Sequence, residues 1–182
     1  MVSKVVNINA CNIINHKIYA GHIDTILGRM LALADDRGLF LLCFVDKQSV
    51  DSESARLSKK LKAEIVFYEN EIIKSIKYEL IAYFSGENVM FKTPCHILGT
   101  DFQKTVWGAL KKIPYGETRS YLDVAKSINH PKAFRAVALA NAANKFPIII
   151  PCHRVINANG NIGGYAGGAS KKMWLLQHEL QS

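Results

Sequence analysis

The sequence predicts two domains, an α/β domain over residues 1–92 and a mainly α-helical domain over residues 93–182 that carries a winged helix-turn-helix-like motif. Two observations separate them. Short apolar runs alternate with helical stretches in the first half, whereas capped helical stretches dominate the second. The charge also changes, because residues 1–98 carry 12 Lys/Arg and 11 Asp/Glu, but residues 99–182 carry 11 Lys/Arg and only 4 Asp/Glu. A chain of 182 residues has room for two such domains.

The first domain contains three predicted strands and two predicted helices. The strands are the β-branched and apolar runs KVVNINACNII, GLFLLCFV and AEIVFYE, and the helices are SESARLSKKLKA and ENEIIKSIKYELIAYFSG. Gly38 and Gly86 punctuate these elements. The acidic residues of this half are scattered and its histidines have no evident partners, so we expect the domain to be a scaffold.

The second domain begins after an irregular junction, SGENVMFKTPCHILGTD, which contains Cys95. Thr100 and Gln103 then have the spacing of a capping box, which predicts a helix start. The helix has one apolar face, formed by Phe102, Val106, Leu110 and Ile113. We expect it to stop at Pro114-Tyr115-Gly116.

A helix-turn-helix is the next predicted feature. Ser120 and Asp123 form a second capping box and start a short helix. Asn129-His130-Pro131 breaks this helix and begins an Ala-rich basic one, with Pro131 suited to the first helical position. Many αα-hairpins share this pattern, but the net charge of +7 on residues 99–182, out of +8 in total, points to a polyanion partner, most simply nucleic acid.

The remaining chain is predicted to hold a buried strand, a loop and a helix. Residues 148–150 are three isoleucines typical of a buried strand, and Asn159-Gly160 predicts a turn. The glycines after residue 162 indicate a loop, and SKKMWLLQHEL predicts a final helix. Leu175 and Glu179 are four residues apart, so this carboxylate is expected to face the core.

Several classes of protein are disfavoured by composition. The sequence has no run of about 18 apolar residues that would span a membrane, and its start does not have the pattern of a signal peptide. A disulfide framework is not expected from four widely spaced cysteines. We predict no metal, although a zinc site built from Cys11, Cys43, Cys95 and one of His16, His22 or His96 stays open.

The tripeptide Pro-Cys-His occurs twice, at Cys95 and at Cys152. Cys152 is followed by His153 and Arg154, two potential cations that are expected to lower the pKa of the thiol and make it a nucleophile. Cys95 has a neighbouring histidine but neither an arginine nor a glycine loop, so we expect it to be inert. A papain-like pair is a poor fit because its histidine comes from a distant segment.

Five segments in order, GTDFQKTVWGALKKIPYGETRSY, PKAFRAV, IPCHRVI, GGYAGG and WLLQHE, strongly resemble the O6-alkylguanine-DNA alkyltransferases, also called methylated-DNA–protein-cysteine methyltransferases. The resemblance covers about residues 99–180. The first half matches by no motif, but its size suits the ribonuclease-H-like α/β domain of that family. The resemblance implies a single-turnover enzyme that moves the alkyl group of O6-alkylguanine in DNA onto its own cysteine, with O4-alkylthymine left open as a second substrate.

The resemblance also implies roles for the residues around the thiol. Cys152 would be the alkyl acceptor, and His153 would take its proton through a water and be oriented by Glu179. Asn144 would organise the turn beneath the site, and Tyr121 would donate a hydrogen bond to the flipped base and help to turn the phosphate. The pocket around the base would be formed by Val155, Tyr165, Ala166 and Pro147.

Arg135, on the second helix of the motif, would fill the space left in the duplex by the extruded base. Ser120, Lys132 and Tyr121 would contact the DNA beside it. The resemblance implies duplex DNA bound through the minor groove, no cofactor, no membrane partner and a monomer. We expect a cytoplasmic location, associated with the nucleoid if the protein is bacterial.

Three positions depart from the pattern of the family. Lys145 stands where a proline commonly follows the asparagine, Ala138-Leu139 replace a stretch that often contains glycine, and Ala166 replaces a serine found in some members. Two rival functions stay open at this point. A DNA-binding damage sensor would need no Cys152, and a cysteine hydrolase would need a distant general base and its own cleft.

Overall fold

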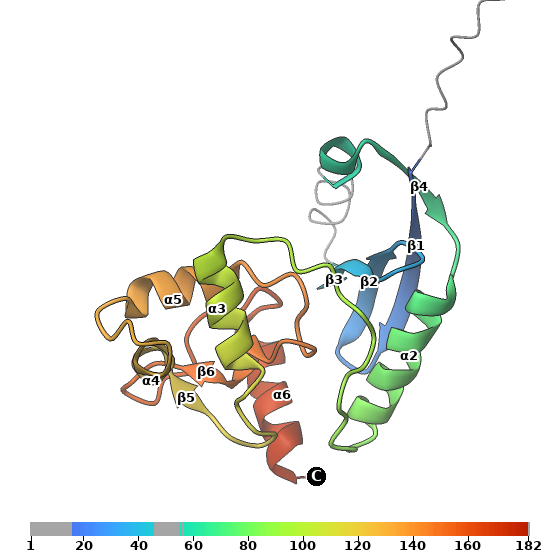
Figure 1. The fold of residues 1–182 in the computed structure, drawn as a ribbon. Helices are drawn as coiled ribbons and strands as arrows, with labels where there is room; N and C mark the ends of the chain where they lie inside the picture. The colour runs from blue at the N-terminus through green and yellow to red at the C-terminus, as the bar shows by residue number, and fades with distance from the viewer. Residues whose placement is uncertain (1–15, 46–54, 56, 182) are drawn as a thin grey trace, which may run out of the picture.

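The computed structural model describes residues 16–45, 55 and 57–181 (Figure 1). The first part of the chain forms a four-stranded sheet in the order β3-β2-β1-β4. The antiparallel strands are β1 (His16–Thr25), β2 (Gly28–Ala34) and β3 (Leu39–Phe44), and β4 (Ala63–Phe67) pairs parallel to β1. Both faces of this sheet are covered, as expected for an α/β domain.

Helix α2 (Glu71–Phe84) covers the face of the sheet that looks towards the rest of the molecule. Asn70 caps its first turn, accepting a hydrogen bond from the Ile73 amide at 3.1 Å. Its buried residues recur at helical spacing, at Ile73, Ile76, Leu80 and Tyr83. The opposite face of the sheet packs against the helical segment 57–61 through a separate small cluster.

These elements test the predictions for the first half. The strands at residues 39–44 and 63–67 and the helix at residues 71–84 are confirmed. The predicted strand at residues 4–14 lies outside the described residues. The β1–β2 hairpin was not predicted, because the apolar residues Ile26 and Leu27 form its turn. The turn chemistry lies in the flanking residues, where the Thr25 hydroxyl bonds the turn backbone and Gly28 adopts φ of 109°.

The junction after α2 belongs structurally to the sheet. The Leu39 amide donates to the Pro94 carbonyl at 2.8 Å, and the His96 amide donates to the Leu39 carbonyl at 2.7 Å. Cys95 therefore forms a parallel bridge with Leu39 at the β3 edge. The domain boundary between residues 92 and 93 falls within this segment and stays a prediction.

The second part of the chain contains four α-helices among the described residues: α3 (Asp101–Leu110), α4 (Tyr121–Ser127), α5 (Phe134–Ala142) and α6 (Ala169–Gln181). A two-stranded parallel sheet, β5 (Arg119–Ser120) with β6 (Val155–Ile156), lies beside them. Both predicted capping boxes are present, with Thr100 and Ser120 as the capping residues. The helix-turn-helix is formed by α4 and α5, which pack against each other and against α3.

Two local predictions in this half are wrong. Helix α5 begins at Phe134 rather than Pro131, since the chain makes one more turn at residues 131–132 before the helix. Residues 148–150 are buried but form a turn, closed by a bridge between Pro147 and Ile150, instead of a strand. Ile148 adopts φ of 75°, which costs a β-branched residue about 1–3 kcal/mol.

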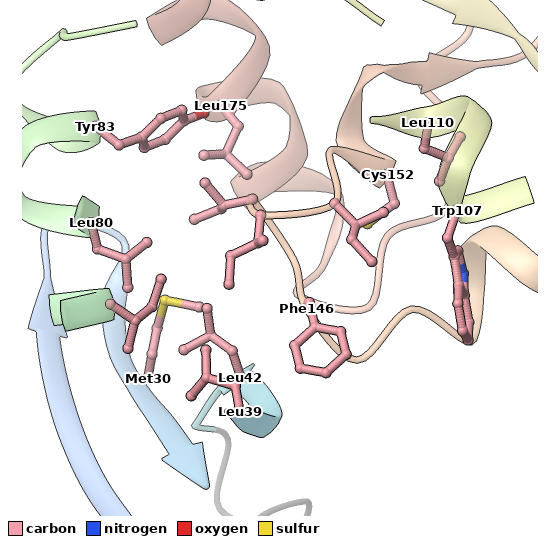
Figure 2. Packing of buried hydrophobic residues seen from close by; sticks show 14 of the residues in the cluster. Met30, Leu39, Leu42, Leu80, Tyr83, Trp107, Leu110, Phe146, Cys152 and Leu175 are labelled. Atoms are coloured by element: carbon pink, nitrogen blue, oxygen red, sulfur yellow. The ribbon is translucent and has the colours of Figure 1, made fainter. Parts of the chain in front are cut away.

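One hydrophobic cluster joins both halves of the molecule (Figure 2). Met30, Leu42 and Leu80 from the first half lie in the same cluster as Phe146 and Leu175 from the second. In the described part of the chain, no helix is long and apolar enough to cross a membrane. The shared core means that the sheet and α2 contribute to the packing behind Cys152.

Candidate active site

Cys152 opens into a cavity of about 340 Å³. The cavity walls come from α4, α5 and the glycine loop, so three separate segments meet at the thiol. Its lining residues are Tyr121, Ala138, Asn141, Ala142, Cys152, Gly164, Tyr165 and Ala166. A concave, mostly apolar space with a few polar groups is typical of a small-molecule or base-binding site.

A tight turn over residues 144–150 positions the cysteine. The Asn144 side chain donates to the Ile150 carbonyl at 2.9 Å and accepts from the Phe146 amide at 2.9 Å. The Cys152 amide donates to the Ile150 carbonyl at 2.7 Å, and Cys152 then begins the short 3₁₀ helix η1 (Cys152–Arg154). Asn144 therefore lies where the sequence analysis expected it, beneath the thiol.

His153 and Glu179 are in direct contact, with 2.8 Å between the His153 Nε2 and Glu179 Oε1 atoms. Both side chains are buried. An ionised carboxylate can only accept, so Nε2 carries the proton of this bond and the neutral ring keeps a lone pair on Nδ1. Burial lowers the pKa of His153, and the positive charges of Arg154 and Lys172 lower it further, although Glu179 raises it. The imidazole is therefore neutral and able to accept a proton.

The Glu179 carboxylate has an unusually complete set of donors. Arg154 donates from Nε to Oε2 at 2.8 Å and from Nη2 to Oε1 at 3.0 Å. The Tyr83 hydroxyl donates to Oε1 at 2.7 Å, and the Gly116 amide to Oε2 at 3.3 Å. Burial alone would raise the pKa of Glu179, but His153 and Arg154 outweigh it and lower that pKa to about 2.

Gly116 has a geometric reason to be glycine. It has φ of 75°, and a Cβ atom there would lie 2.9 Å from the Glu179 carbonyl oxygen. A larger residue would push this turn away from α6. The close approach is what lets the Gly116 amide reach the carboxylate.

The prediction that His153 and Arg154 lower the pKa of the Cys152 thiol is wrong. Burial raises this pKa to about 11, although a hydrogen bond from Asn144 and the charge of Lys172 act in the opposite direction. Arg154 is directed at Glu179, and its Nη1 atom donates to the Ile113 carbonyl at 2.7 Å. The resting thiol is therefore protonated, and it requires a base to become a nucleophile.

Lys172 is a buried cation beside the site. Its ammonium donates to the Val155 carbonyl at 2.6 Å and to the Gly164 carbonyl at 3.3 Å. Burial lowers its pKa to about 8, while a thiolate at Cys152 would act to raise it. Lys172 therefore ties α6 to β6 and to the glycine loop, in addition to placing a positive charge near the thiol.

The aromatic residues predicted for the pocket are brought to it. Tyr121, the first residue of α4, lines the cavity, and burial raises its pKa, which a thiolate at Cys152 would raise further. A raised pKa keeps the phenol protonated and able to donate. Tyr165 and Ala166 also line this cavity, whereas Pro147 lines a neighbouring cavity of about 140 Å³. Val155 is fully buried and faces neither of these two spaces.

The residues predicted to contact DNA lie on or before the two helices of the motif. Arg135 is exposed on α5, with its guanidinium 5.7 Å from the centre of the Phe134 ring. Lys132 is exposed in the turn before α5. Ser120 caps α4 by accepting from the Asp123 amide at 3.0 Å, so its hydroxyl is already used within the protein.

Sequence reasoning missed three residues of the site. Lys172 could have been found, because it shares a helical face with Leu175 and Glu179 at spacings of three and seven. Asn141, whose side chain donates to the Cys152 carbonyl at 3.2 Å, lies three residues before Asn144 but carries no separate signal. Tyr83 is 96 residues from Glu179 in the chain, and no local pattern connects them.

No group of three or more His, Cys, Asp or Glu side chains that could hold a metal occurs within residues 16–45, 55 and 57–181. Cys11 of the alternative zinc site lies outside the described residues.

Two family models match the chain. The model described as the ribonuclease-like domain of 6-O-methylguanine DNA methyltransferase matches residues 18–97, and the DNA binding domain of the same enzyme matches residues 101–181. The methylated-DNA–protein-cysteine methyltransferase of Methanosarcina acetivorans is 42% identical over 163 residues, which are 89% of this chain and 98% of that protein. The chain belongs to this family.

Solved structures of methyltransferases agree with the assignment. The crystal structure of a Mycobacterium tuberculosis O6-methylguanine methyltransferase matches with a TM-score of 0.77 and 36% identity, over 90% of this chain and 93% of that one. An OGT of the same organism in complex with DNA matches with a TM-score of 0.76 and 37% identity over the same shares. The predicted fold, a ribonuclease-like α/β domain followed by a helical DNA-binding domain, is confirmed.

Proposed function

We propose that this methyltransferase repairs DNA by moving the alkyl group of O6-alkylguanine onto its own Cys152. The observation that carries the proposal is the 2.8 Å contact between His153 and an ionised Glu179 beside a cysteine that opens into a cavity. This arrangement provides a base for a thiol that is otherwise protonated. Family membership supplies the reaction class.

The proposed reaction is one displacement. The Cys152 proton passes to Nδ1 of His153, directly or through one water, and the thiolate attacks the alkyl carbon. A sulfur–carbon bond forms as the carbon–oxygen bond breaks, and the electron pair stays with the guanine. Tyr121 gives the departing base a proton, and the proton held by His153 restores the phenol. The thioether does not hydrolyse, so each molecule acts once.

The DNA side of the proposal follows from the position of the thiol. Cys152 is buried at the cavity, so a base stacked in a duplex cannot reach it and must be flipped out. The exposed Arg135 is proposed to fill the gap, and the basic second half to hold the phosphates of the minor groove. We further propose a monomer that works in the cytoplasm, on the nucleoid if the source is bacterial.

The test is the mass of the intact protein after incubation with excess duplex DNA containing O6-methylguanine. We expect a gain of one methyl group per molecule, located on the peptide that contains Cys152, and no further turnover. Binding without a mass change would favour a damage sensor. Repeated release of product would favour a hydrolase.

A further inference from the structure

The side chain of Tyr83 connects the first domain to the proton relay proposed for Cys152, His153 and Glu179. Tyr83 lies in the last turn of α2, is 1% exposed, and donates its hydroxyl to Glu179 at 2.7 Å. Figure 2 shows its ring extending from α2 towards the helix that carries Leu175. The neighbouring His178 ring bonds the Tyr83 carbonyl at 2.8 Å, so both the backbone and the side chain of Tyr83 are held against α6. This geometry leaves the hydroxyl little freedom to turn elsewhere.

Tyr83 shares one carboxylate oxygen with the base of the proposed reaction. Glu179 Oε1 accepts from Tyr83 at 2.7 Å, from His153 at 2.8 Å and from Arg154 at 3.0 Å. Each donor draws negative charge from this oxygen and fixes its direction. Tyr83 therefore influences both how strongly Glu179 attracts the proton on His153 and where the imidazole ring lies.

The surroundings make the tyrosine a permanent donor. Burial raises its pKa far above the ordinary range, and the charge of Glu179 raises it further. The other charged and titratable groups facing this pair come from the second part of the chain: Arg154 and His153 on η1, Lys172 and His178 on α6, Tyr115 before β5 and Tyr165 on the glycine loop. Of the pair and the groups around it, Tyr83 is the one that the first domain supplies.

We propose that Tyr83 is a positioning residue for alkyl transfer, through which the first domain fixes Glu179 and so holds His153 as the neutral base for Cys152. The proposal rests on the proposed function. It assigns the α/β domain a part in the reaction, whereas the sequence alone indicates a scaffold. Tyr83 does not touch the cavity, so its effect reaches the thiol through Glu179 and His153.

The test is the Tyr83→Phe variant of the full chain, with Tyr115→Phe as the matched control. Tyr115 lies next to Tyr83, with ring centres 6.1 Å apart, and its buried hydroxyl has no hydrogen-bond partner within the described part of the chain. The two variants remove the same atom from the same cluster. Only the first removes a donor from Glu179.

Single-turnover methyl transfer from duplex DNA is the first measurement. We expect Tyr83→Phe to slow transfer about tenfold at pH 7, the scale of losing one hydrogen bond to a charged group. Without the Tyr83 hydroxyl, Glu179 has one donor fewer and attracts the His153 proton more strongly. This stabilises the protonated form of His153, so the acid limb of the pH–rate profile should move to higher pH. Tyr115→Phe should stay within about twofold of the parent, with an unchanged profile.

The second measurement does not depend on DNA. Nuclear magnetic resonance of the ring nitrogens of His153 reports which nitrogen carries the proton and at what pH the second one binds. We expect a proton on Nε2 in the parent protein, and a higher titration midpoint in Tyr83→Phe. This result would support the positioning role even if the parent protein transferred no methyl group, so the two proposals fail separately.

A double variant decides whether the effect passes through Glu179. In a Glu179→Gln background, Tyr83→Phe should cost less than about twofold in rate, because the link is already broken. If the double variant instead lost rate by the product of the two single-variant factors, the proposal would be overturned. So would a lower melting temperature in Tyr83→Phe with no shift in the titration of His153, since a purely structural tyrosine would behave in that way.

Discussion

The two Pro-Cys-His segments are more alike in the structure than in the sequence. His96 Nε2 lies 2.8 Å from an Asp35 oxygen, and His153 Nε2 lies 2.8 Å from a Glu179 oxygen. Burial raises the pKa of both thiols, Cys95 and Cys152, to about 11. A cysteine, a histidine and an acid are therefore present twice, and neither thiol is ionised at rest.

The segments differ in what surrounds them. The backbone at Cys95 extends the sheet beside β3, and its sulfur donates to the Thr93 carbonyl at 3.6 Å. His96 is partly exposed and stacks on the Phe40 ring, with centres 4.2 Å apart. Cys152 instead opens into the 340 Å³ cavity next to Tyr121. A shared residue set does not make two sites equivalent, because a nucleophile also needs a space for substrate and a donor for the leaving group.

The largest contrast is expected from removing each thiol. Cys152→Ala should abolish methyl transfer, while Cys95→Ala should transfer at a rate within about twofold of the parent. Quantitative transfer from labelled duplex DNA measures both. Cys152→Ala should still bind DNA with a strong salt dependence, since its basic residues are unchanged. Methyl found on Cys95 would reverse the comparison.

The next largest contrast in transfer rate is expected between the two acids, Glu179 and Asp35. Glu179→Gln should slow transfer on the order of 100-fold, because an amide cannot stabilise the protonated form of His153. Asp35→Asn should leave the rate within about twofold and act on the stability of the junction alone. Single-turnover kinetics and thermal unfolding, run on both variants, separate these effects. An unchanged rate of methyl transfer in Glu179→Gln would remove this acid from the relay.

Helix α5 should distinguish the two segments to a smaller degree. Asn141 connects α5 to the Cys152 carbonyl, so this helix lies against the segment that carries the thiol, and the proposed function assigns Arg135 on the same helix to the gap in the duplex. Arg135→Ala should slow transfer from duplex DNA about tenfold and leave reaction with free O6-benzylguanine unchanged. Lys59→Ala, in the first domain, removes the same charge and serves as the control. Equal losses on both substrates would rule out the gap-filling role.

The smallest difference between the two thiols is expected in their ionisation in the absence of substrate. An acid whose folded pKa is raised from 9.0 to about 11 stays protonated until the pH approaches that value. At pH 8 both cysteines should therefore label with iodoacetamide about 100-fold more slowly than a thiol of pKa 9, and both rates should climb tenfold per pH unit. A Cys152 plateau near pH 7 would show that the thiolate is preformed.

The parts of the fold that local chemistry determines could be predicted from the sequence. The capping boxes at Thr100 and Ser120 located α3 and α4, and the four-residue spacing of Leu175 and Glu179 placed the acid inside. Prediction failed where tertiary contacts determine the local backbone structure. Pro131 satisfies the rules for a helix start, but the chain turns once more before α5. The three isoleucines at residues 148–150 suit a strand, yet the Asn144 side chain bonds the backbone and bends it into a turn.

The chemistry of the site was partly out of reach for the same reason. Neighbours in sequence suggested that Arg154 activates Cys152, but this side chain is directed at Glu179, and burial controls the thiol. Tyr83 was assigned no role because its partner is 96 residues away. Charge and motif order predicted several of the residues that meet, whereas the protonation state of each group depends on its burial.

The late position of α6 in the chain has a consequence for synthesis on the ribosome. Domains fold from the N-terminus as the chain emerges, so the sheet, Tyr83 and the cavity residues Tyr121 and Cys152 are all made before Glu179. A nascent chain halted before α6 would hold the thiol and the lining residues of its cavity but neither the Glu179 carboxylate nor Lys172. Translation thus delays completion of the reactive site until α6 has been made and has docked.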